Sequence, residues 1–334
     1  MKKNSISAFY LKCILLALPF ILLLAFYIYK DPFMVLRPYQ DYDHSRISQN
    51  EGEVSWMKYK MYRNRMHYDS FILGNSCTKA FQSSDWNRYV HGHSLRMFAN
   101  SEDLGGVYMK IEALNRQPDQ PIKNLLLVME PSTFINADSK EDFMHIMPPE
   151  VSHKSQITYQ MTFLQGFFTP KFFLPYMKYL ITGKYTDNMH GIINEDVLTR
   201  RRYTNDAILP QEKAIAKMGD GFWKQDYWLK ILKESHPLKI QPRALTSSQI
   251  AEFKDIKSIC QHHHTNLKIV ISPEFKKKVM NPKDINVLNA IFGPHVVYDF
   301  SNKHYLWMDN KHNFYDSDHY RVTLGKEILK IIYQ

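Results

Sequence analysis

The sequence has few cysteines: Cys13, Cys77 and Cys260 are the only three in 334 residues. They include no C-x-x-C pair, which argues against a disulfide framework and against a zinc site built on paired cysteines. Cys77 and Cys260 could pair if the domain is exported, because oxidising compartments permit disulfides. Two buried free thiols are the simpler alternative. Glycine is also scarce, with 12 residues against 16 methionines, which excludes collagen-like and disordered chains.

The charge balance is basic, and the length suits one large domain. The chain carries 43 Lys and Arg against 33 Asp and Glu, a formal net charge of +10. Such a balance suits nucleic acid, an anionic membrane or acidic glycans, and it does not choose among them. With 44% hydrophobic residues, the chain can bury the core of one sizeable α/β domain with an elaboration, or of two small domains. We favour one domain.

One long uncharged run stands near the N-terminus. Residues 13–29, CILLALPFILLLAFYIY, carry no charge, and with residues 8–12 the segment can cross a bilayer core of ~30 Å. Lys2 and Lys3 precede it, so the positive-inside rule predicts a cytoplasmic N-terminus and an extracytoplasmic remainder. The alternative, a cleaved signal peptide, finds no small-residue cleavage site in AFYIYKD. We therefore expect residues 1–30 to hold the chain in the cell membrane as an uncleaved single-pass anchor.

Beyond the anchor, short apolar runs alternate with segments of helical character. A polar stretch at 31–66 is interpreted as a stalk or linker, and a domain follows at 67–334. Short continuous apolar runs between helices indicate an α/β fold with a parallel sheet buried on both faces. The predicted strands are 71–73, 95–98, 124–129, 267–272 and 296–300. The predicted helices are 103–115, 247–263, 282–291 and 322–332.

The stretch from about 135 to 242 interrupts this alternation. It is rich in Met, Phe, Tyr and Trp and has no strand-like spacing. We interpret it as a mostly helical insertion that caps the carboxyl edge of the sheet. Its aromatic side chains could touch the membrane surface or stack on sugar rings, but such a stretch is more often core.

The stretch YDSFILGNSCTKAF, residues 68–81, places a serine directly after the first predicted strand. Ser76 would lie at the carboxyl edge of the sheet, where open α/β folds hold their ligands. The helix that follows could offer N–H groups to an oxyanion. The alternative is that Ser76 or Thr78 only caps that helix. Gly-x-Ser alone does not decide between the two.

A nucleophilic serine needs a base, and usually a third group that orients the base. A D-x-x-H pair suits both roles, because the carboxylate can reach the imidazole and hold its tautomer. Five such pairs occur, so the motif alone is no evidence: Asp41/His44, Asp142/His145, Asp187/His190, Asp309/His312 and Asp316/His319. Two pairs follow the last predicted strand, but only Asp316/His319 leads directly into the terminal helix. We predict His319 as the base and Asp316 as its partner, with His312 as second choice.

A Gly-x-Ser after the first strand and a D-x-x-H before the last helix resemble the SGNH (GDSL-like) hydrolase superfamily. ILGNS matches the first block, with Asn75 where the family has aspartate, and DSDHYRVTLG matches the last block. The chain resembles in particular the membrane-anchored, outward-facing members that handle acyl groups on cell-envelope polymers. The resemblance covers about 71–129 and 267–332 and leaves the insertion outside.

This resemblance implies a three-layer α/β/α sandwich and a catalytic triad of Ser76, His319 and Asp316. It also implies that no metal and no organic cofactor is required.

The oxyanion-binding residues are less well matched. Gly74, Asn75 and Ser76 would form the first binding loop. The family has a glycine in its second block, where this chain reads FANSEDLGG, so Asn100 or Ser101 would have to serve. The third block, Gly-x-Asn-Asp, is absent, and VMEPSTF stands in its place. The second oxyanion donor is therefore not assigned.

Two functions follow. The first is a serine acyl-esterase or O-acyltransferase that acts outside the membrane on an acylated polysaccharide or other envelope polymer. The second is a catalytically silent module of the same fold that binds glycan or docks to a membrane-bound acyltransferase. The retained serine, histidine and aspartate favour the first, whereas Asn75 and the missing third block favour the second. No nucleic-acid fold signature accompanies the charge, so nucleic acid is not an expected partner.

Overall fold

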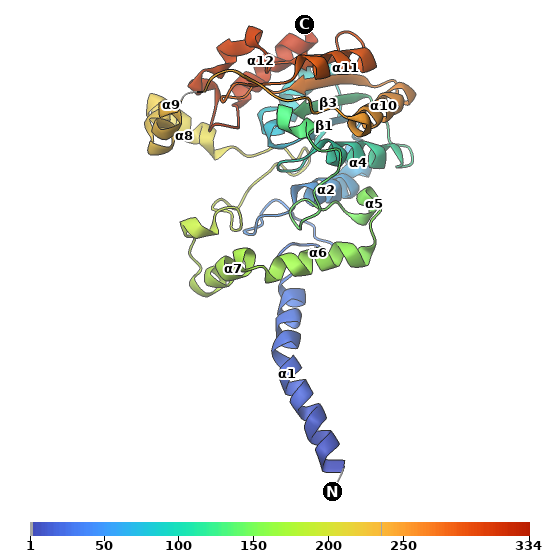
Figure 1. The fold of residues 1–334 in the computed structure, drawn as a ribbon, viewed down its shortest axis with the longest axis vertical. Coiled ribbons are helices and arrows are strands. Elements are labelled where there is room, and N and C mark those ends of the chain that lie inside the picture. The colour runs from blue at the N-terminus through green and yellow to red at the C-terminus, as the bar shows by residue number, and fades with distance from the viewer. Residues whose placement is uncertain (1–2, 235) are drawn as a thin grey trace.

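The computed structural model describes residues 3–234 and 236–334. Its centre is a parallel five-stranded sheet in the order β2-β1-β3-β5-β7 (Figure 1). The strands are β1 (Ser70–Gly74), β2 (Ser94–Phe98), β3 (Asn124–Met129), β5 (Asn266–Ile271) and β7 (Val297–Asp299). These are the five strands predicted from the short apolar runs, which confirms an α/β fold with a parallel sheet.

Helices cover both faces of this sheet, which explains why its strands are mostly apolar. Every residue of β1, β2 and β3 is buried. Because side chains alternate along a strand, Phe71 and Leu73 join one apolar cluster and Ile72 joins another. The first cluster receives side chains from α2 (Glu51–Met66), α4 (Leu104–Asn115), α10 (Ser247–His262) and α11 (Pro282–Phe292). The second receives them from α3 (Ser83–Val90), α8 (Pro210–Met218), α9 (Asp226–Lys233) and α12 (Val322–Tyr333).

The strand order reverses between β1 and β3. From β1 the chain crosses to β2 on one side, and then returns past β1 to β3 on the other. In open parallel sheets, ligands bind outside the carboxyl ends of the strands at such a reversal. Gly74 ends β1 there with φ of 136°, and a Cβ atom on it would lie 1.8 Å from the carbonyl oxygen of Val128 in β3. Only glycine allows this turn and this close approach.

The segment expected to be a stalk, residues 31–66, is instead part of the folded domain. Its second half is helix α2, and Trp56 and Tyr59 on that helix are almost completely buried in the first apolar cluster. The prediction was wrong because the helix is polar in composition although its first half is almost wholly buried. Even Lys58 is buried, where its ammonium pairs with Asp43.

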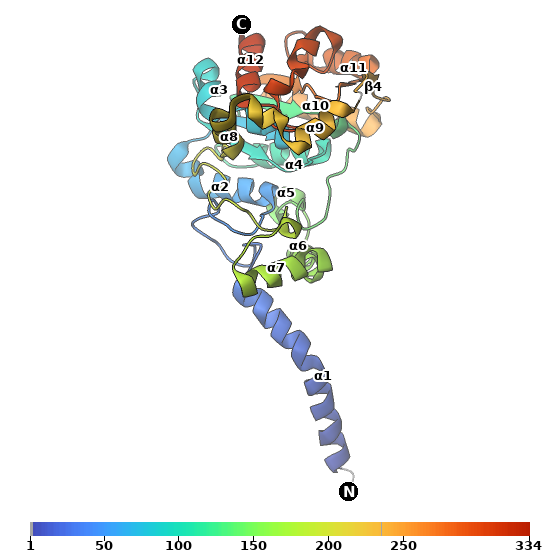
Figure 2. The ribbon, with the colours of Figure 1, turned by 90° about the vertical axis from the view of Figure 1, so that its left-hand side faces the viewer.

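The insertion expected at about 135–242 is largely helical, and its parts lie in different places. It contains α5 (Pro149–Ser152), α6 (Gln156–Phe168), α7 (Pro170–Thr182), α8 and α9. It also contains the short strand β4 (Lys239–Ile240), which pairs in parallel with β6 (Lys278–Val279) and had not been predicted. Helices α6 and α7 lie beside the end of α1 (Figure 2). Residues within 185–211 line a cleft beside Ser76, so this part lies over the carboxyl edge.

Helix α1 (Lys3–Lys30) extends away from the rest of the chain (Figure 1). Among the described residues it holds the one segment long and apolar enough to cross a membrane, Ile6–Lys30. Its side chains are mostly exposed, and Tyr27 near its end is buried. Length and composition thus fit the single-pass anchor. The side of the membrane on which the domain lies stays a prediction.

A buried carboxyl group joins α2 to α6. Glu53 of α2 is 6% exposed, and the hydroxyl of Tyr159 in α6 donates to its Oε2 at 2.5 Å. Burial raises the pKa of Glu53 from 4.5 to about 7, although the hydrogen bond from Tyr159 acts in the opposite direction. The folded chain therefore holds a proton on Glu53 that the unfolded chain loses above pH 4.5.

We expect Glu53→Gln to stabilise the protein more at pH 8 than at pH 5. The parent loses stability as the pH rises from about 4.5 to about 7, because the folded state binds the extra proton. Glutamine keeps the acceptor for Tyr159 and cannot ionise, so the gain at pH 8 should be on the order of 3 kcal/mol. Thermal unfolding in detergent at both values measures it, with the exposed Glu327→Gln as control. Equal gains at both pH values would contradict the assignment.

Candidate active site

Asn75 organises the turn that carries Ser76. Its Oδ1 accepts the N–H of Cys77 at 3.0 Å and so caps the short 3-10 helix η1 (Ser76–Ala80). Its Nδ2 donates to Oε2 of Glu130, just after β3, at 2.8 Å. Asn75 therefore joins the carboxyl ends of β1 and β3 and supplies the cap that helix termini require. The hydroxyl of Ser76 does not cap the helix and forms a hydrogen bond with another residue.

That partner is His319. Oγ of Ser76 lies 2.8 Å from Nε2 of His319, although the two residues are 243 positions apart. On the other side of the ring, Nδ1 lies 2.9 Å and 3.0 Å from the two carboxylate oxygens of Asp316. The structure therefore brings Ser76, His319 and Asp316 together in the serine–base–carboxylate arrangement that nucleophilic catalysis uses.

The tertiary contact, rather than the D-x-x-H motif, distinguishes this histidine. The bond from Nδ1 to the carboxylate forms in three of the five pairs: Asp41/His44 at 2.8 Å, Asp142/His145 at 2.7 Å and Asp316/His319 at 2.9 Å. Only His319 then places its second nitrogen on a serine hydroxyl. His312, the second choice, packs against the ring of Trp223 at 4.6 Å between centroids and does not line the cleft.

Asp316 is held as a carboxylate. Burial by itself would raise its pKa. The hydrogen bond and charge of His319, together with the backbone N–H groups of Asp318 and His319, outweigh the effect of burial. Those two N–H groups both donate to Oδ1 at 2.8 Å. The net pKa of Asp316 lies below its ordinary value. An ionised Asp316 accepts the Nδ1 proton of His319 and leaves the Nε2 lone pair for the proton of Ser76.

A cleft of about 520 Å³ opens over this serine. Its walls come from the turn after β1, from the loop before α12 and from the insertion. The insertion contributes most of one wall through residues 190–200 and 207–211. A ligand can therefore reach Ser76 from outside.

Three cationic side chains line the cleft, and sequence reasoning predicted none of them for the site: Lys79, Arg96 and Arg200, of which Arg200 pairs with Glu51. Side chains three residues apart in a 3-10 helix lie on one face, so Lys79 shares a face with Ser76, and both line the cleft. Within the described chain the ammonium of Lys79 makes no hydrogen bond or ion pair, and it lies 5.9 Å from the ring of Phe98. Burial lowers its pKa. A partly desolvated amino group thus lines the same cleft as Ser76.

Arg96 is the second cation. It lies in β2, 1% exposed, with Nε donating to the carbonyl oxygen of Asn205 at 3.0 Å and its guanidinium 3.9 Å from the ring centre of Phe98. Burial lowers its pKa to about 10, so it stays charged at neutral pH. An arginine inside an apolar strand, LRMF, was the signal that could have identified it. A charge is buried in a sheet only where something compensates it.

Several residues predicted for oxyanion binding lie elsewhere. Gly74 and Asn75 are buried, and they set the conformation of the turn. Asn100 and Ser101 form a turn after β2, and neither lines the cleft. The carbonyl oxygen of Ser101 instead accepts a hydrogen bond from Nζ of Lys140 at 2.5 Å.

The cysteines are unpaired, as in the simpler of the two alternatives. Cys77 and Cys260 are buried free thiols. Burial raises the pKa of Cys77, and the neighbouring charge of Glu130, which accepts a hydrogen bond from Sγ at 2.9 Å, raises it further. Cys77 therefore stays a thiol at neutral pH and is a poor nucleophile. Within residues 3–234 and 236–334, no group of three or more His, Cys, Asp or Glu is placed to hold a metal ion.

Comparison of the chain with protein-family models, with curated proteins and with solved structures found no match in any of the three. The resemblance to SGNH hydrolases therefore stays a prediction from the two motifs.

The Asp316→Asn variant should change the tautomer of His319. The backbone N–H groups of Asp318 and His319 would keep the amide oxygen in the place of Oδ1. The amide NH₂ would then face Nδ1 as a donor, so Nδ1 must accept and the ring proton moves to Nε2. Nitrogen-15 NMR of labelled histidine should record Nδ1–H in the parent and Nε2–H in the variant. Nε2–H in the parent would contradict the arrangement.

Proposed function

We propose that this protein is a membrane-anchored serine acyl-esterase or O-acyltransferase of the SGNH type, acting on an acylated envelope saccharide. One observation carries the proposal: Oγ of Ser76 lies 2.8 Å from Nε2 of His319. This contact joins two motifs that lie 243 positions apart in the sequence.

In the proposed reaction, Oγ of Ser76 attacks the acyl carbonyl carbon while Nε2 of His319 takes the hydroxyl proton. The tetrahedral intermediate collapses, and His319 gives the proton to the departing alcohol, which leaves an acyl ester on Ser76. Water or a saccharide hydroxyl then attacks this ester, again with His319 as base. Asp316 stabilises the imidazolium that forms in each half of the cycle.

The developing oxyanion needs donors that are not already in use. In η1, the N–H of Cys77 already donates to Oδ1 of Asn75, and the N–H of Thr78 donates to the carbonyl oxygen of Asn75. The N–H of Ser76 heads the helix and has no acceptor within it. We assign it as the first oxyanion donor and the ammonium of Lys79 as an electrostatic partner, in place of Asn100 and Ser101.

The features that favoured a silent module have a structural role here. Asn75 stands where the family has aspartate, and it caps η1 and binds Glu130. Glu130 belongs to the stretch VMEPSTF that replaces the third family block. The two residues that differ from the family pattern, Asn75 and Glu130, therefore bind each other across the ends of β1 and β3. This supports a functional site over one that has lost its activity.

Ser76→Ala should abolish covalent labelling by a fluorophosphonate and lower the turnover of aryl acetates by about 10³-fold or more. The lost group is one small hydroxyl, so the fold should stay intact. Intact-protein mass spectrometry measures labelling, and circular dichroism checks the fold. Ser48→Ala is the matched control, because Ser48 lines the same cleft but bonds to Oδ1 of Asn194 at 3.1 Å.

Persistent labelling in Ser76→Ala would exclude this nucleophile. Absence of labelling and of turnover in the parent chain would favour the second hypothesis, a silent module that binds glycan or docks to a membrane-bound acyltransferase.

A further inference from the structure

Helices α6 and α7, residues 156–182, form a surface beside the end of α1 that the proposed chemistry does not use. We infer that this surface, here called the platform, lies in the headgroup layer of an anionic bilayer and is a second membrane contact besides α1. The inference depends on α1 being the anchor and does not depend on the reaction at Ser76.

The platform is attached to the end of α1 by aromatic packing. Tyr27 of α1 lies 5.0 Å from Phe167 of α6 between ring centres. Phe33, just after α1, lies 4.6 Å from Phe172 of α7 and 5.5 Å from Phe163 of α6. These rings belong to one buried cluster. The height of the platform is therefore set by the height of α1 in the membrane.

The length of α1 places this junction at the membrane surface. The apolar span has 25 residues, which at ~1.5 Å each is ~37 Å, against a hydrocarbon core of ~30 Å. The excess of ~7 Å is a little more than one helical turn. The last turn of α1, which contains Tyr27, then lies in the headgroup layer. Figures 1 and 2 show α6 and α7 across the end of α1 at this level.

The platform carries apolar side chains on its outer side as well as on its packed side. Ile157, Leu174 and Ile181 are 77%, 63% and 79% exposed. Met161 and Phe168 continue the row on α6, at the spacing of one helix face, and are also exposed. Helices with one face in the protein core and apolar residues on the other are typical of contact with a membrane or a second protein.

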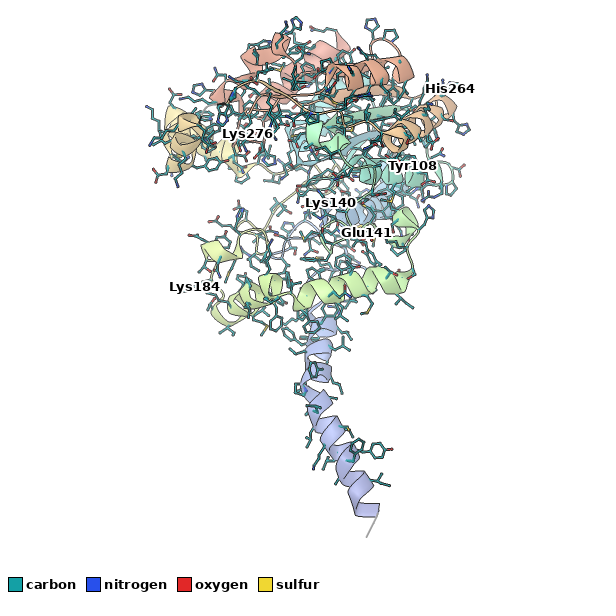
Figure 3. All side chains as sticks on the ribbon, in the orientation of Figure 1. Tyr108, Lys140, Glu141, Lys184, His264 and Lys276 are labelled. Atoms are coloured by element: carbon teal, nitrogen blue, oxygen red, sulfur yellow. The ribbon has the colours of Figure 1, made fainter. Side chains whose placement is uncertain are left out.

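Charge favours the membrane. Residues 155–186 contain Lys171, Lys178 and Lys184 and no acidic residue. All three lysines are exposed, and Figure 3 shows Lys184 beyond the end of α7. Apolar side chains flanked by lysines match a bilayer with anionic headgroups.

A second contact would fix how the catalytic cleft faces the membrane. One helix alone leaves the domain free to rotate about it and to tilt. The residues that line the cleft from the insertion begin at Tyr185, three positions after α7 ends at Thr182. Binding of the platform to the membrane would hold this wall of the cleft, and with it Ser76, at a fixed distance from the lipid headgroups.

Depth-dependent fluorescence quenching tests the inference on the full chain in anionic nanodiscs. Single cysteines replace Ile157 or Ile181 in a Cys13→Ala background and carry an environment-sensitive dye, because Cys77 and Cys260 are buried. Ala290→Cys, exposed on α11 at the opposite end of the domain, is the matched control. Leu16→Cys within α1 reports insertion. Nitroxide-labelled lipids serve as quenchers.

We expect several-fold more quenching at 157 and 181 than at 290, and less of it in nanodiscs of phosphatidylcholine alone. Quenching at 157 and 181 no greater than at 290, while Leu16→Cys is strongly quenched, would overturn the membrane contact and point to a protein partner instead. Lack of quenching at position 16 would remove the anchor on which the inference depends. Equal quenching in both lipids would overturn the anionic preference. Fluorophosphonate labelling of the same samples reports separately on Ser76.

Discussion

The hydrogen bond between Ser76 and His319, 2.8 Å long, depends on several parts of the fold at once. Ser76 reaches its position because Gly74 allows β1 to turn against β3 and because Asn75 supplies the cap of η1. His319 reaches its position because α12 packs on the second face of the sheet and fixes the loop before it. Asp316, three positions before His319 in the sequence, then orients the imidazole ring through a hydrogen bond with Nδ1. A shift in the carboxyl end of β1 or of β3, or in α12, would separate Ser76 from the Asp316–His319 pair.

Much of the sheet could be predicted because burial on both faces leaves a simple pattern in the sequence. Runs such as LLLVM, residues 125–129 of β3, are wholly apolar, and the helices between them end near the expected residues. Helix α2 was missed because its apolar residues, such as Trp56 and Tyr59, stand among charged ones, such as Glu53 and Lys58, so a buried face did not stand out. The triad was predicted from two motifs, and His319 was chosen over four other histidines because only its pair leads directly into the terminal helix. The structure places this histidine on Ser76. Lys79 and Arg96 were missed because their relation to Ser76 depends on which side of η1 and β2 faces the cleft.

The insertion does more than cap the sheet, because its two parts have different roles. Its first part, α6 and α7, packs its aromatic side chains on the end of α1. Its later part lines the cleft through residues between 185 and 211. The aromatic residues that were expected to be core are core in part, because Phe163, Phe167 and Phe172 are buried, whereas Phe168 is 43% exposed. The insertion therefore runs without interruption from the helices that pack on α1 to the residues that line the cleft.

Trapping of an acyl-enzyme tests the central claim most directly. The full chain would be mixed with 4-nitrophenyl acetate, quenched with acid within seconds and digested, and the peptide that contains residues 68–81 would be analysed by mass spectrometry. We expect an acetyl group on Ser76 in the parent chain and none in His319→Gln, because the hydroxyl then lacks its base. An acetyl group on another residue, no acetyl group in the parent, or equal acetylation in His319→Gln would contradict the assignment of Ser76 and His319 as nucleophile and base.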